Sequence, residues 1–462
     1  MSLHLLHYAD VENAFDTPER VGRLVGTVDA LRDESTLVTG SGDNTAPGVL
    51  SLVTSGRHAR FLFDAVEPAV DTFGNHDFDH GLDALRETVK TSPQTWLTAN
   101  LQYRGERLFA DRTEPRTLVE TPDATVGFVG VTTPDLHDLC PEARDVAVSD
   151  PVDAVAEHVP KLREASADHV VILSHSGVPV DERIAANTGV DAVLGGHDHE
   201  ELVEHVDGTL VLHPGQGGTH LLEAEFDADG EPTARHHETS EFPADEEVVD
   251  AVRTEAEAAG LTDVVAHWEE PVLLTERARK QAESTVGNLL MDAHRWQTDA
   301  DVALCIGGIR EDTPLQGDVT VADLVGLVPY GNDIVVCEVD GETLRDALHQ
   351  LSVAYRYPDA GVPWFGHVSG VRLAWDDRDQ TLRDAQVGGE AIDSEAAYEV
   401  ALSRYFVDSD HLFSVFDPDD VVRTVGQEHE AVVDYVREHP ERPRVDGRVE
   451  RPFLDETRPP IR

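Results

Sequence analysis

The sequence predicts a layered α/β protein with two domains. Its 462 residues are too many for one ordinary hydrophobic core, and a chain of this length usually divides into two or three domains. Short β-type runs alternate with helical stretches from residue 3 to about residue 235, which is the pattern of sheets covered by helices. A second alternation of this kind begins near residue 271, after an acidic segment with helical spacing.

The first region, 1–235, contains the clearer alternation. The β-type runs lie at 3–8, 36–39, 69–73, 169–173 and 191–194, and the helical stretches lie at 20–31, 81–90, 151–165 and 179–188. A glycine-rich turn at 215–218 precedes one more strand at 221–226, and the polar residues 227–232 then close the region.

The remaining chain divides into a linker, a second domain and a tail. Residues 236–270 include an acidic helix at 244–260, which we expect to be a solvated linker. The second domain, 271–440, is expected to contain helices at 284–298, 320–328 and 341–351 and strands at 303–306 and 334–339. Ser284 or Thr285 is the expected cap of the first of these helices. Residues 441–462, rich in Pro and Arg, are expected to form a loosely packed tail.

The composition excludes several classes of partner. The chain has 90 acidic and 36 basic residues, a formal net charge of −54, and only three lysines. High salt screens self-repulsion on this scale, so the composition is typical of a protein from the high-salt cytoplasm of a haloarchaeon. No basic patch is present, which argues against nucleic acid and anionic membranes as partners.

The sequence also predicts a cytoplasmic location. The first strand begins at Leu3, which leaves no room for a signal peptide, and no apolar run approaches the length of a membrane span. Three widely spaced cysteines without a C-x-x-C pattern indicate reduced thiols. The oligomeric state is left open by these observations.

Five clusters of metal-ligand residue types each follow a β-type run. They are Asp10-Val11-Glu12, Gly42-Asp43-Asn44, Gly74-Asn75-His76-Asp77-Phe78-Asp79, His175-Ser176-Gly177 and Gly195-Gly196-His197-Asp198-His199. Each of them alone has an ordinary structural explanation, such as a turn, a helix cap or a hydrated loop. Ligands in open α/β sheets bind outside the carboxyl ends of the strands, so five such clusters predict one shared site. Carboxylate, imidazole and amide groups suit divalent ions such as Zn, Mn, Fe or Co.

These clusters, in this order, resemble the calcineurin-like metallophosphoesterases, and G-N-H-D-F-D is similar to the G-N-H-E-F-D of their 5′-nucleotidase branch. The resemblance implies a β-sandwich flanked by helices and two divalent metal ions. The metal ligands it implies are Asp10, Glu12, Asp43, Asn75, His175, His197 and His199. Asp43 would bridge the two ions, whereas His76, paired with Asp79, would act in catalysis without binding either metal.

The second domain resembles the nucleotide-binding C-terminal domain of 5′-nucleotidases through its strings E-S-T-V-G-N-L, G-G-I-R, L-V-P-Y-G-N and V-S-G-V-R. By that resemblance Gly308 and Arg310 would contact the substrate, and Tyr330 would stack on its base. Phe413 is a candidate for the second stacking face. The structural alternatives are that Arg310 pairs with nearby acidic residues and that Tyr330 or Phe413 packs in the hydrophobic core.

Three positions depart from the family pattern. Glu12 stands where most relatives carry a histidine ligand, and its extra negative charge favours harder ions such as Mn or Mg. Cys305 replaces an asparagine, and Ala282 replaces a substrate arginine of some nucleotidases, although Arg279 or Lys280 is placed to substitute for it.

The resulting expectation is a two-metal phosphohydrolase that acts on small-molecule nucleotides. The close alternative is cleavage of a 2′,3′-cyclic nucleotide or of a nucleotide-sugar pyrophosphate by the same metal centre. An alternative from a different class is a catalytically silent sensor of nucleotides or metal, and the retention of both His76 and Asp79 argues against it.

Overall fold

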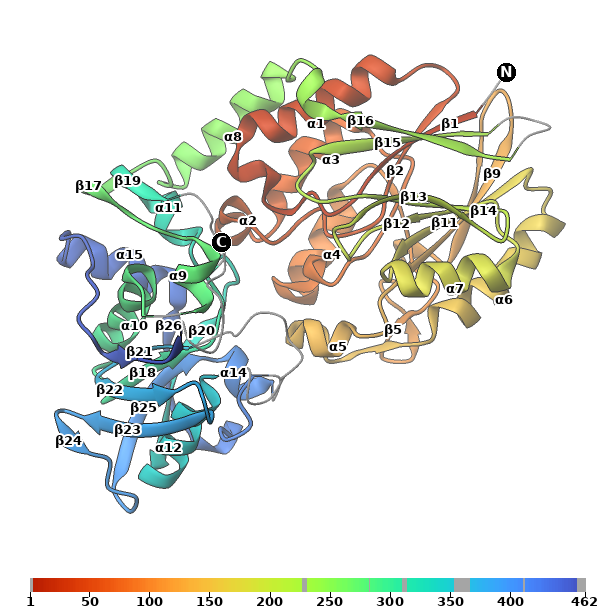
Figure 1. Ribbon diagram of the computed structural model, residues 1–462. Coiled ribbons are helices and arrows are strands. Elements are labelled where there is room, and N and C mark those ends of the chain that lie inside the picture. Colours follow the sequence, from red (N-terminus) through yellow and green to blue (C-terminus); the bar gives the residue numbers. More distant parts are fainter. Residues whose placement is uncertain are drawn as a thin grey trace. The chain divides into compact units, whose positions relative to one another are not determined.

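The computed structural model describes residues 3–226, 231–281, 283–309, 314–352, 366–409 and 412–454. The chain divides into two compact units, Met1–Ala259 and Gly260–Arg462. Figure 1 shows the first unit in red to light green and the second in green to blue.

Two large sheets form the centre of the first unit. The seven-stranded sheet has the order β16-β15-β1-β2-β3-β4-β7, and the six-stranded sheet has the order β13-β14-β12-β11-β9-β8. The strands of the first sheet are β1 (Leu3–Tyr8), β2 (Thr36–Gly40), β3 (Val70–Thr72), β4 (Thr95–Leu97), β7 (Thr113–Glu114), β15 (His220–Phe226) and β16 (Thr233–Glu238). Those of the second are β8 (Arg116–Glu120), β9 (Thr125–Thr132), β11 (His169–His175), β12 (Ala192–Gly195), β13 (Glu201–Val206) and β14 (Thr209–Pro214).

The two sheets pack face to face, which confirms the predicted sandwich. Val171 and Leu173 of β11 share one buried core with Leu5 of β1, so they point towards the opposite sheet. The alternate residues Val170 and Ile172 belong to a second core on the outer face. This division follows from the two-residue period of a strand, because each buried strand supplies both faces of its sheet with apolar side chains.

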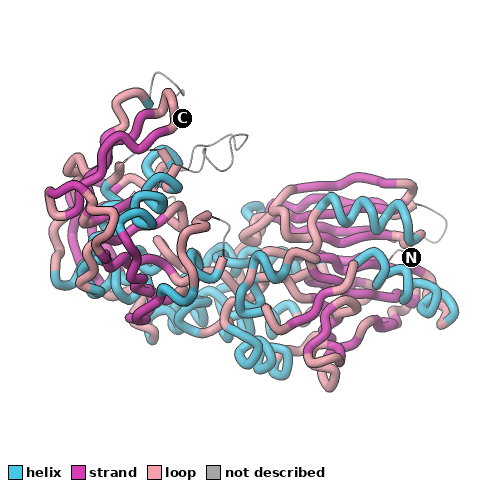
Figure 2. Tube along the Cα trace, turned by 90° about the horizontal axis from the view of Figure 1, so that it is seen from below, coloured by secondary structure: helices cyan, strands magenta, loops and turns pink. Residues whose placement is uncertain are grey.

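Helices lie around the sandwich (Figure 2). They are α1 (Pro18–Leu31), α2 (Val49–Thr54), α3 (Arg60–Val66), α4 (Gly81–Thr91), α5 (Leu136–Leu139), α6 (Pro151–Glu164), α7 (Val178–Thr188) and α8 (Glu246–Ala258). Of these, α6 and α7 pack on strands of the six-stranded sheet, and α1 packs on β15 of the seven-stranded sheet. The short strands β5 (Leu101–Tyr103), β6 (Glu106–Arg107) and β10 (Val146–Val148) form a small third sheet. The acidic segment forms α8, which packs on α1 and buries Val248, Val249 and Val252.

The second unit contains a five-stranded sheet, β21-β18-β25-β20-β26, a four-stranded sheet, β24-β23-β22-β27, and the pair β17-β19. The strands are β17 (Val264–Val272), β18 (Val302–Cys305), β19 (Leu315–Thr320), β20 (Asp333–Asp340), β21 (His367–Ser369), β22 (Val371–Asp376), β23 (Thr381–Val387), β24 (Glu390–Ala391), β25 (Ala397–Ser403), β26 (Val421–Gln427) and β27 (Val449–Glu450). The helices are α9 (Glu276–Lys280), α10 (Thr285–Thr298), α11 (Val321–Val325), α12 (Gly341–Gln350), α14 (Tyr405–Asp408) and α15 (Glu428–Glu438). Ser284 caps α10 as expected, because its hydroxyl accepts the Gly287 N–H at 3.1 Å.

Two arginines of the C-terminal segment, Arg448 and Arg451, form ion pairs within the second unit, which contradicts the expectation of a loosely packed tail at these positions. Arg448 Nη1 donates to Asp292 Oδ1 at 2.7 Å. The Arg451 side chain is only 4% exposed and pairs with Asp377, whose side chain is 1% exposed. The arginines that suggested a solvated tail instead neutralise carboxylates of the second unit, and this pairing makes their burial possible.

Candidate metal-binding site

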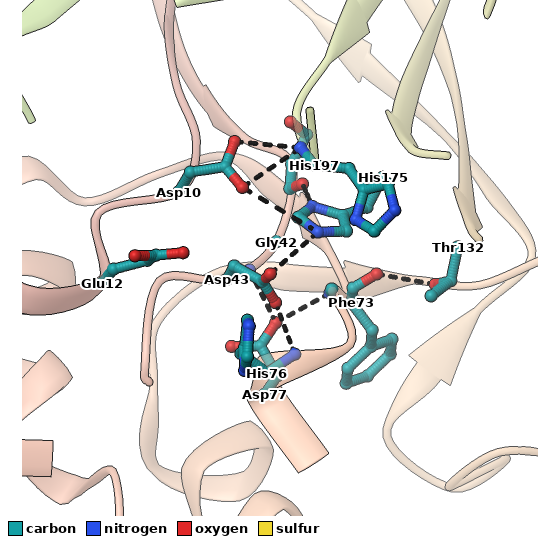
Figure 3. Close-up of polar contacts among 12 residues, drawn as sticks. Asp10, Glu12, Gly42, Asp43, Phe73, His76, Asp77, Thr132, His175 and His197 are labelled. Carbon is teal, nitrogen blue, oxygen red and sulfur yellow. Dashed lines mark hydrogen bonds and ion pairs between the residues drawn. The ribbon is translucent and has the colours of Figure 1, made fainter. Parts of the chain in front are cut away.

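Parallel strands of both sheets bring the candidate ligands to one place. Asp10, Asp43 and Asn75 follow β1, β2 and β3, which are parallel neighbours in the seven-stranded sheet. His175 ends β11 and His197 follows β12, and these two strands are parallel neighbours in the six-stranded sheet. Figure 3 shows Asp43 between Asp10 and His76, with His175 beside it.

The backbone at these positions is unusual. Five of the candidates adopt a left-handed conformation: Asp10 (φ 50°), Glu12 (φ 43°), Asp43 (φ 51°), His197 (φ 88°) and His199 (φ 59°). Residues with a Cβ rarely occupy this region, and such strain is typical of ligand-binding turns that the surrounding fold holds in place.

The candidate ligand atoms form three overlapping groups. His199 Nε2 lies 3.0 Å from Glu12 Oε1 and 3.7 Å from Asp10 Oδ1. His175 Nε2 lies 3.0 Å from Asp43 Oδ2 and 3.9 Å from Asp10 Oδ1. In each of the groups Asp10–Glu12–His199, Asp10–Asp43–His175 and Glu12–Asp43–His76, all three ligand atoms lie within 4.8 Å of one another, so each group could hold an ion.

Two of the histidines make further contacts that help to hold them in the site. The Nδ1–H of His175 donates to the Ser41 carbonyl oxygen at 2.7 Å, which leaves Nε2 directed at Asp43. Such a bond fixes the tautomer and the ring orientation of a metal-binding histidine. The backbone N–H of His197 lies 3.1 Å from both Asp10 carboxylate oxygens, and its ring centroid is 5.1 Å from that of His175.

Several buried polar atoms in the site lack a hydrogen-bond partner within the described part of the chain. They include Asn75 Oδ1, and Asp43 Oδ2 and His175 Nε2, which approach each other at 3.0 Å. Buried polar groups are normally satisfied, and a set of orphaned oxygen and nitrogen acceptors fits the coordination of a cation. The donor set therefore fits divalent metal ions.

The pKa values of the site residues also indicate that a positive charge would be stabilised there. Burial would lower the pKa of His175, but the adjacent Asp43 carboxylate raises it to about 10. Burial raises the pKa of Asp10 to about 7, and the nearby Asp43 and Glu12 carboxylates add to this rise against the opposing effect of His175. Acids this close together disfavour each other's ionised form, whereas a cation among them would favour it.

His76 and Asp79 form the pair expected from the sequence. His76 Nδ1 lies 2.9 Å from Asp79 Oδ2, and the two side chains are 25% and 16% exposed. Burial would lower the pKa of His76, but the Asp79 and Asp43 carboxylates raise it to about 10. The backbone N–H of His76 also donates to Asp43 Oδ1 at 2.7 Å, so His76 contacts the candidate metal bridge through its main chain. The pair can therefore present a protonated imidazole beside the ligands.

Two buried acids near Asp43 were not predicted to have a role. Asp77 is 3% exposed and accepts hydrogen bonds from the Asp43 and Gly74 backbone N–H groups, and Asp71 is 0% exposed and contacts Asn44. Asp77 lies inside the G-N-H-D string but carried no assignment. Asp71 is a charged residue inside a buried strand, and that was the signal from which it could have been found.

Family comparisons agree with this geometry. Residues 3–201 match the calcineurin-like phosphoesterase model, and residues 264–418 match the model of the 5′-nucleotidase C-terminal domain. The first region of the chain thus matches a calcineurin-like phosphoesterase domain and the second a 5′-nucleotidase C-terminal domain. These matches support a metal-dependent phosphoester hydrolase.

Among its relatives, an apyrase of Anopheles gambiae is 22% identical over 94% of this chain and 87% of its own length. The human 5′-nucleotidase is 25% identical over 77% of this chain and 70% of its own length. The solved structure of a Thermus thermophilus 5′-nucleotidase precursor superposes with a TM-score of 0.77 at 24% identity, over 97% of this chain and 99% of that one. No helix among the described residues combines the length and the hydropathy needed to cross a membrane.

The substrate-binding candidates lie in the second unit of this phosphoesterase. Gly308 is exposed at φ 78°, with open space where a Cβ would stand, and Tyr330 is partly exposed just after α11. Phe413 is 1% exposed, and its ring makes edge contacts with Phe406 and Phe416. This burial favours the core role that the sequence had left open for Phe413. Arg310 lies outside the described residues.

The departures from the family pattern are only partly visible. Cys305 is 5% exposed at the end of β18, and burial raises the pKa of its thiol to about 12, so it is a neutral packing group. Arg279 Nη1 donates to the carbonyl oxygen of Ile309 at 3.0 Å, which places Arg279 beside the G-G-I-R segment. Ala282 lies outside the described residues.

Proposed function

We propose that this protein is a two-metal phosphomonoesterase that removes phosphate from nucleotides. One observation carries the proposal. Asp10, Glu12 and Asp43 each belong to two of three overlapping groups of candidate ligands, and the backbone of His76, which pairs with Asp79, contacts the same Asp43 carboxylate. A pair of divalent ions bound by such a set would stabilise both the attacking and the leaving oxygen of an in-line displacement.

The ligands divide naturally into two sets. Asp10, Glu12 and His199 would hold one ion, and Asn75, His175 and His197 would hold the other, with Asp43 shared between them. Asp43 suits the shared position because its carboxylate lies within 4.8 Å of ligand atoms assigned to each set, namely those of Asp10 and Glu12 in the first set and that of His175 in the second. Glu12 makes the first set rich in oxygen, which favours Mn²⁺ over Zn²⁺.

In this proposal His76 acts as the general acid. Asp79 accepts the His76 Nδ1–H, so the tautomer and the plane of the ring are set, and the imidazolium charge is stabilised. Nε2 of His76 is then the group that can hold a proton for the leaving ester oxygen. A sensor of metal or nucleotide would have no use for this hydrogen-bonded pair.

The nucleotide specificity is assigned to the second unit. Its match to the 5′-nucleotidase C-terminal domain supports this assignment, and so does the name of the human relative. Tyr330 is the residue proposed to stack on the base, with Gly308 and Arg310 nearby in the sequence. The acidic composition and the three free, buried cysteines support a reducing, high-salt cytoplasm as the location.

The test is phosphate release from a panel of substrates in molar KCl. The panel contains nucleoside 5′-monophosphates, 2′,3′-cyclic nucleotides, nucleotide sugars and p-nitrophenyl phosphate, each assayed with Mn²⁺, Co²⁺, Zn²⁺ or Mg²⁺. We expect the highest kcat/KM for a 5′-monophosphate with Mn²⁺. Preference for a cyclic or pyrophosphate substrate would keep the metal centre but overturn the monoesterase assignment. Metal binding without turnover of any substrate would support a sensor.

A further inference from the structure

Two buried aspartates outside the proposed ligand set lie against the loop that carries Asp43. Asp71 is on β3 and is 0% exposed, and Asp77 follows β3 and is 3% exposed. We call these two residues the aspartate cradle. Buried carboxylates are costly unless hydrogen bonds satisfy them, so their contacts indicate what they hold in place.

The two aspartates of the cradle bind the four consecutive residues 42–45 in turn: Asp71 binds the first and third, and Asp77 the second and fourth. Asp71 Oδ1 accepts the Gly42 N–H at 3.3 Å, and Asp77 Oδ2 accepts the Asp43 N–H at 3.1 Å. Asp71 Oδ2 then accepts the Asn44 side-chain amide at 3.3 Å.

The fourth contact completes the alternation, because the Thr45 hydroxyl donates to Asp77 Oδ1 at 2.7 Å. Every residue from 42 to 45 is therefore held by one or other of the two aspartates.

The loop needs this support because its backbone is strained. Asp43 adopts a left-handed conformation with φ 51°, which costs a residue with a Cβ more than the usual backbone conformations do. Asp77 Oδ2 also accepts the Gly74 N–H at 2.8 Å, so one oxygen joins the loop after β2 to the loop after β3.

The loop after β2 and the loop after β3 are in direct contact. A Cβ at Gly74 would stand 2.0 Å from Asp43 Oδ1, so the carboxylate of Asp43 is in contact with the backbone of the G-N-H-D turn. That same oxygen accepts the His76 N–H at 2.7 Å. The position of the candidate metal bridge and the position of the candidate acid are thus set by one shared turn.

We infer that Asp77, assisted by Asp71, is a positioning residue that pre-organises the Asp43 carboxylate to receive two divalent ions. The inference rests on the proposed function, because it presumes that Asp43 binds metal. Neither aspartate faces the ions in this scheme, and both act through the backbone and side chains of residues 42–45. Outer groups of this kind typically change metal affinity by about 10- to 100-fold.

The experiment measures Mn²⁺ binding to the metal-free, full-length protein by titration calorimetry and by the EPR signal of free Mn²⁺. Asp77→Ala removes the acceptor of the two backbone N–H groups, and we expect it to weaken Mn²⁺ binding about 10- to 100-fold. Asp77→Asn can keep its amide oxygen on those N–H groups and donate its NH₂ to Thr45, so it should recover most of the affinity. Asp377→Ala, which removes a buried acid of the second unit, is the matched control and should bind Mn²⁺ as the wild type does.

The melting temperature of each metal-free variant separates positioning from general stability. A merely structural role would lower the melting temperature of Asp77→Ala but leave its Mn²⁺ affinity within about twofold of the wild type, and this result would overturn the inference. Equal losses for Asp77→Ala and Asp77→Asn would overturn it too, because charge and not geometry would then matter. If Asp77→Ala does not fold, Thr45→Val removes one contact of the cradle and should weaken binding about tenfold, whereas unchanged affinity would refute the inference.

The same data distinguish this inference from the proposed function. If the wild-type protein binds Mn²⁺ but hydrolyses no phosphoester, the proposed phosphomonoesterase function is refuted. The Mn²⁺ affinities of the Asp77 variants then still decide the inference about the cradle. A wild-type protein that binds no divalent ion refutes both.

Discussion

The His76–Asp79 pair offers the sharpest test of the chemistry. His76→Ala removes the imidazole but keeps the backbone N–H that donates to Asp43 Oδ1 at 2.7 Å. The metal sites should therefore remain, while the loss of a general acid lowers kcat by about 10²- to 10⁴-fold. His76 is also one of the three residues in the group with Glu12 and Asp43, so the alternative, that it binds metal, is a real one.

The expected loss of kcat in the smaller substitution Asp79→Asn can be worked out from the His76–Asp79 hydrogen bond. The bond from His76 Nδ1 to Asp79 Oδ2 is 2.9 Å long and mostly shielded from solvent. A hydrogen bond to a charged group contributes about 1.5–3 kcal/mol and a neutral one about 0.5–1.5 kcal/mol, so replacing one by the other costs about 1–1.5 kcal/mol. This corresponds to a loss of about 5- to 13-fold in kcat.

Comparing two substrates shows whether the variants lose proton donation to the leaving group or lose activity for a general structural reason. A nucleoside leaves as a poor alkoxide and needs a proton, whereas p-nitrophenolate leaves as a stable anion without one. Phosphate release should therefore fall much more for a nucleoside monophosphate than for p-nitrophenyl phosphate in both variants, with the bound metal content unchanged. Equal losses on both substrates would refute the role of His76 as an acid, and loss of metal from His76→Ala would make it a ligand.

Four further outcomes are expected. Glu12→His should lower the ratio of Mn²⁺ to Zn²⁺ affinity by about tenfold or more in competition titrations, because it replaces a charged oxygen ligand by a neutral nitrogen; an unchanged ratio would mean that Glu12 is not a ligand. Chelation of the metal should lower the melting temperature of the first unit by about 5–10 °C, the effect of removing a ligand present at about 100 times its Kd, and calorimetry with and without EDTA would contradict this if the transitions coincide. Raising KCl from tens of millimolar towards molar should raise the melting temperature, since screening reduces the repulsion from a net charge of −54, and a flat or falling series would exclude the halophilic interpretation. Tyr330→Ala should reduce kcat/KM for nucleotides by about five- to more than a hundred-fold while sparing p-nitrophenyl phosphate, and equal losses would identify Tyr330 as a packing residue.

Much of the fold could be predicted because its signals are local. Strands β1 and β11 and helices such as α7 and α12 lie within a few residues of the predicted ranges, since two-residue and 3.6-residue periods are visible in short windows. The sheet order is not local, and nothing in the sequence shows that β9 lies between β8 and β11. The tail was mispredicted for the same reason, because the partners of Arg448 and Arg451 lie far away in the sequence.

The candidate ligands were similarly visible because each lies in a short cluster of ligand residue types at the end of a strand or just after it. Asp43 and His175 could be assigned to one site once the carboxyl ends of parallel strands were brought to one edge. Whether they bind metal stays a prediction. The residues that support them could not be assigned in this way. Asp71 serves Gly42 and Asn44 across 29 and 27 positions of sequence, and no local pattern reports such a contact.

The distribution of charge explains why ligands and supports belong together. Asp10, Glu12, Asp43, Asp71 and Asp77 are all at most 3% exposed in one part of a single unit. Burial raises the pKa of Asp77 to about 6, with the Asp43 carboxylate adding to the effect, just as burial raises that of Asp10. A divalent cation that binds among so many buried carboxylates would stabilise the fold. In our inference the aspartate cradle holds the Asp43 carboxylate in its binding position before the ion binds. Hydrogen bonds from residues 42–45 offset part of the cost of burying Asp71 and Asp77. We expect a bound divalent ion to offset the cost of burying Asp10, Glu12 and Asp43.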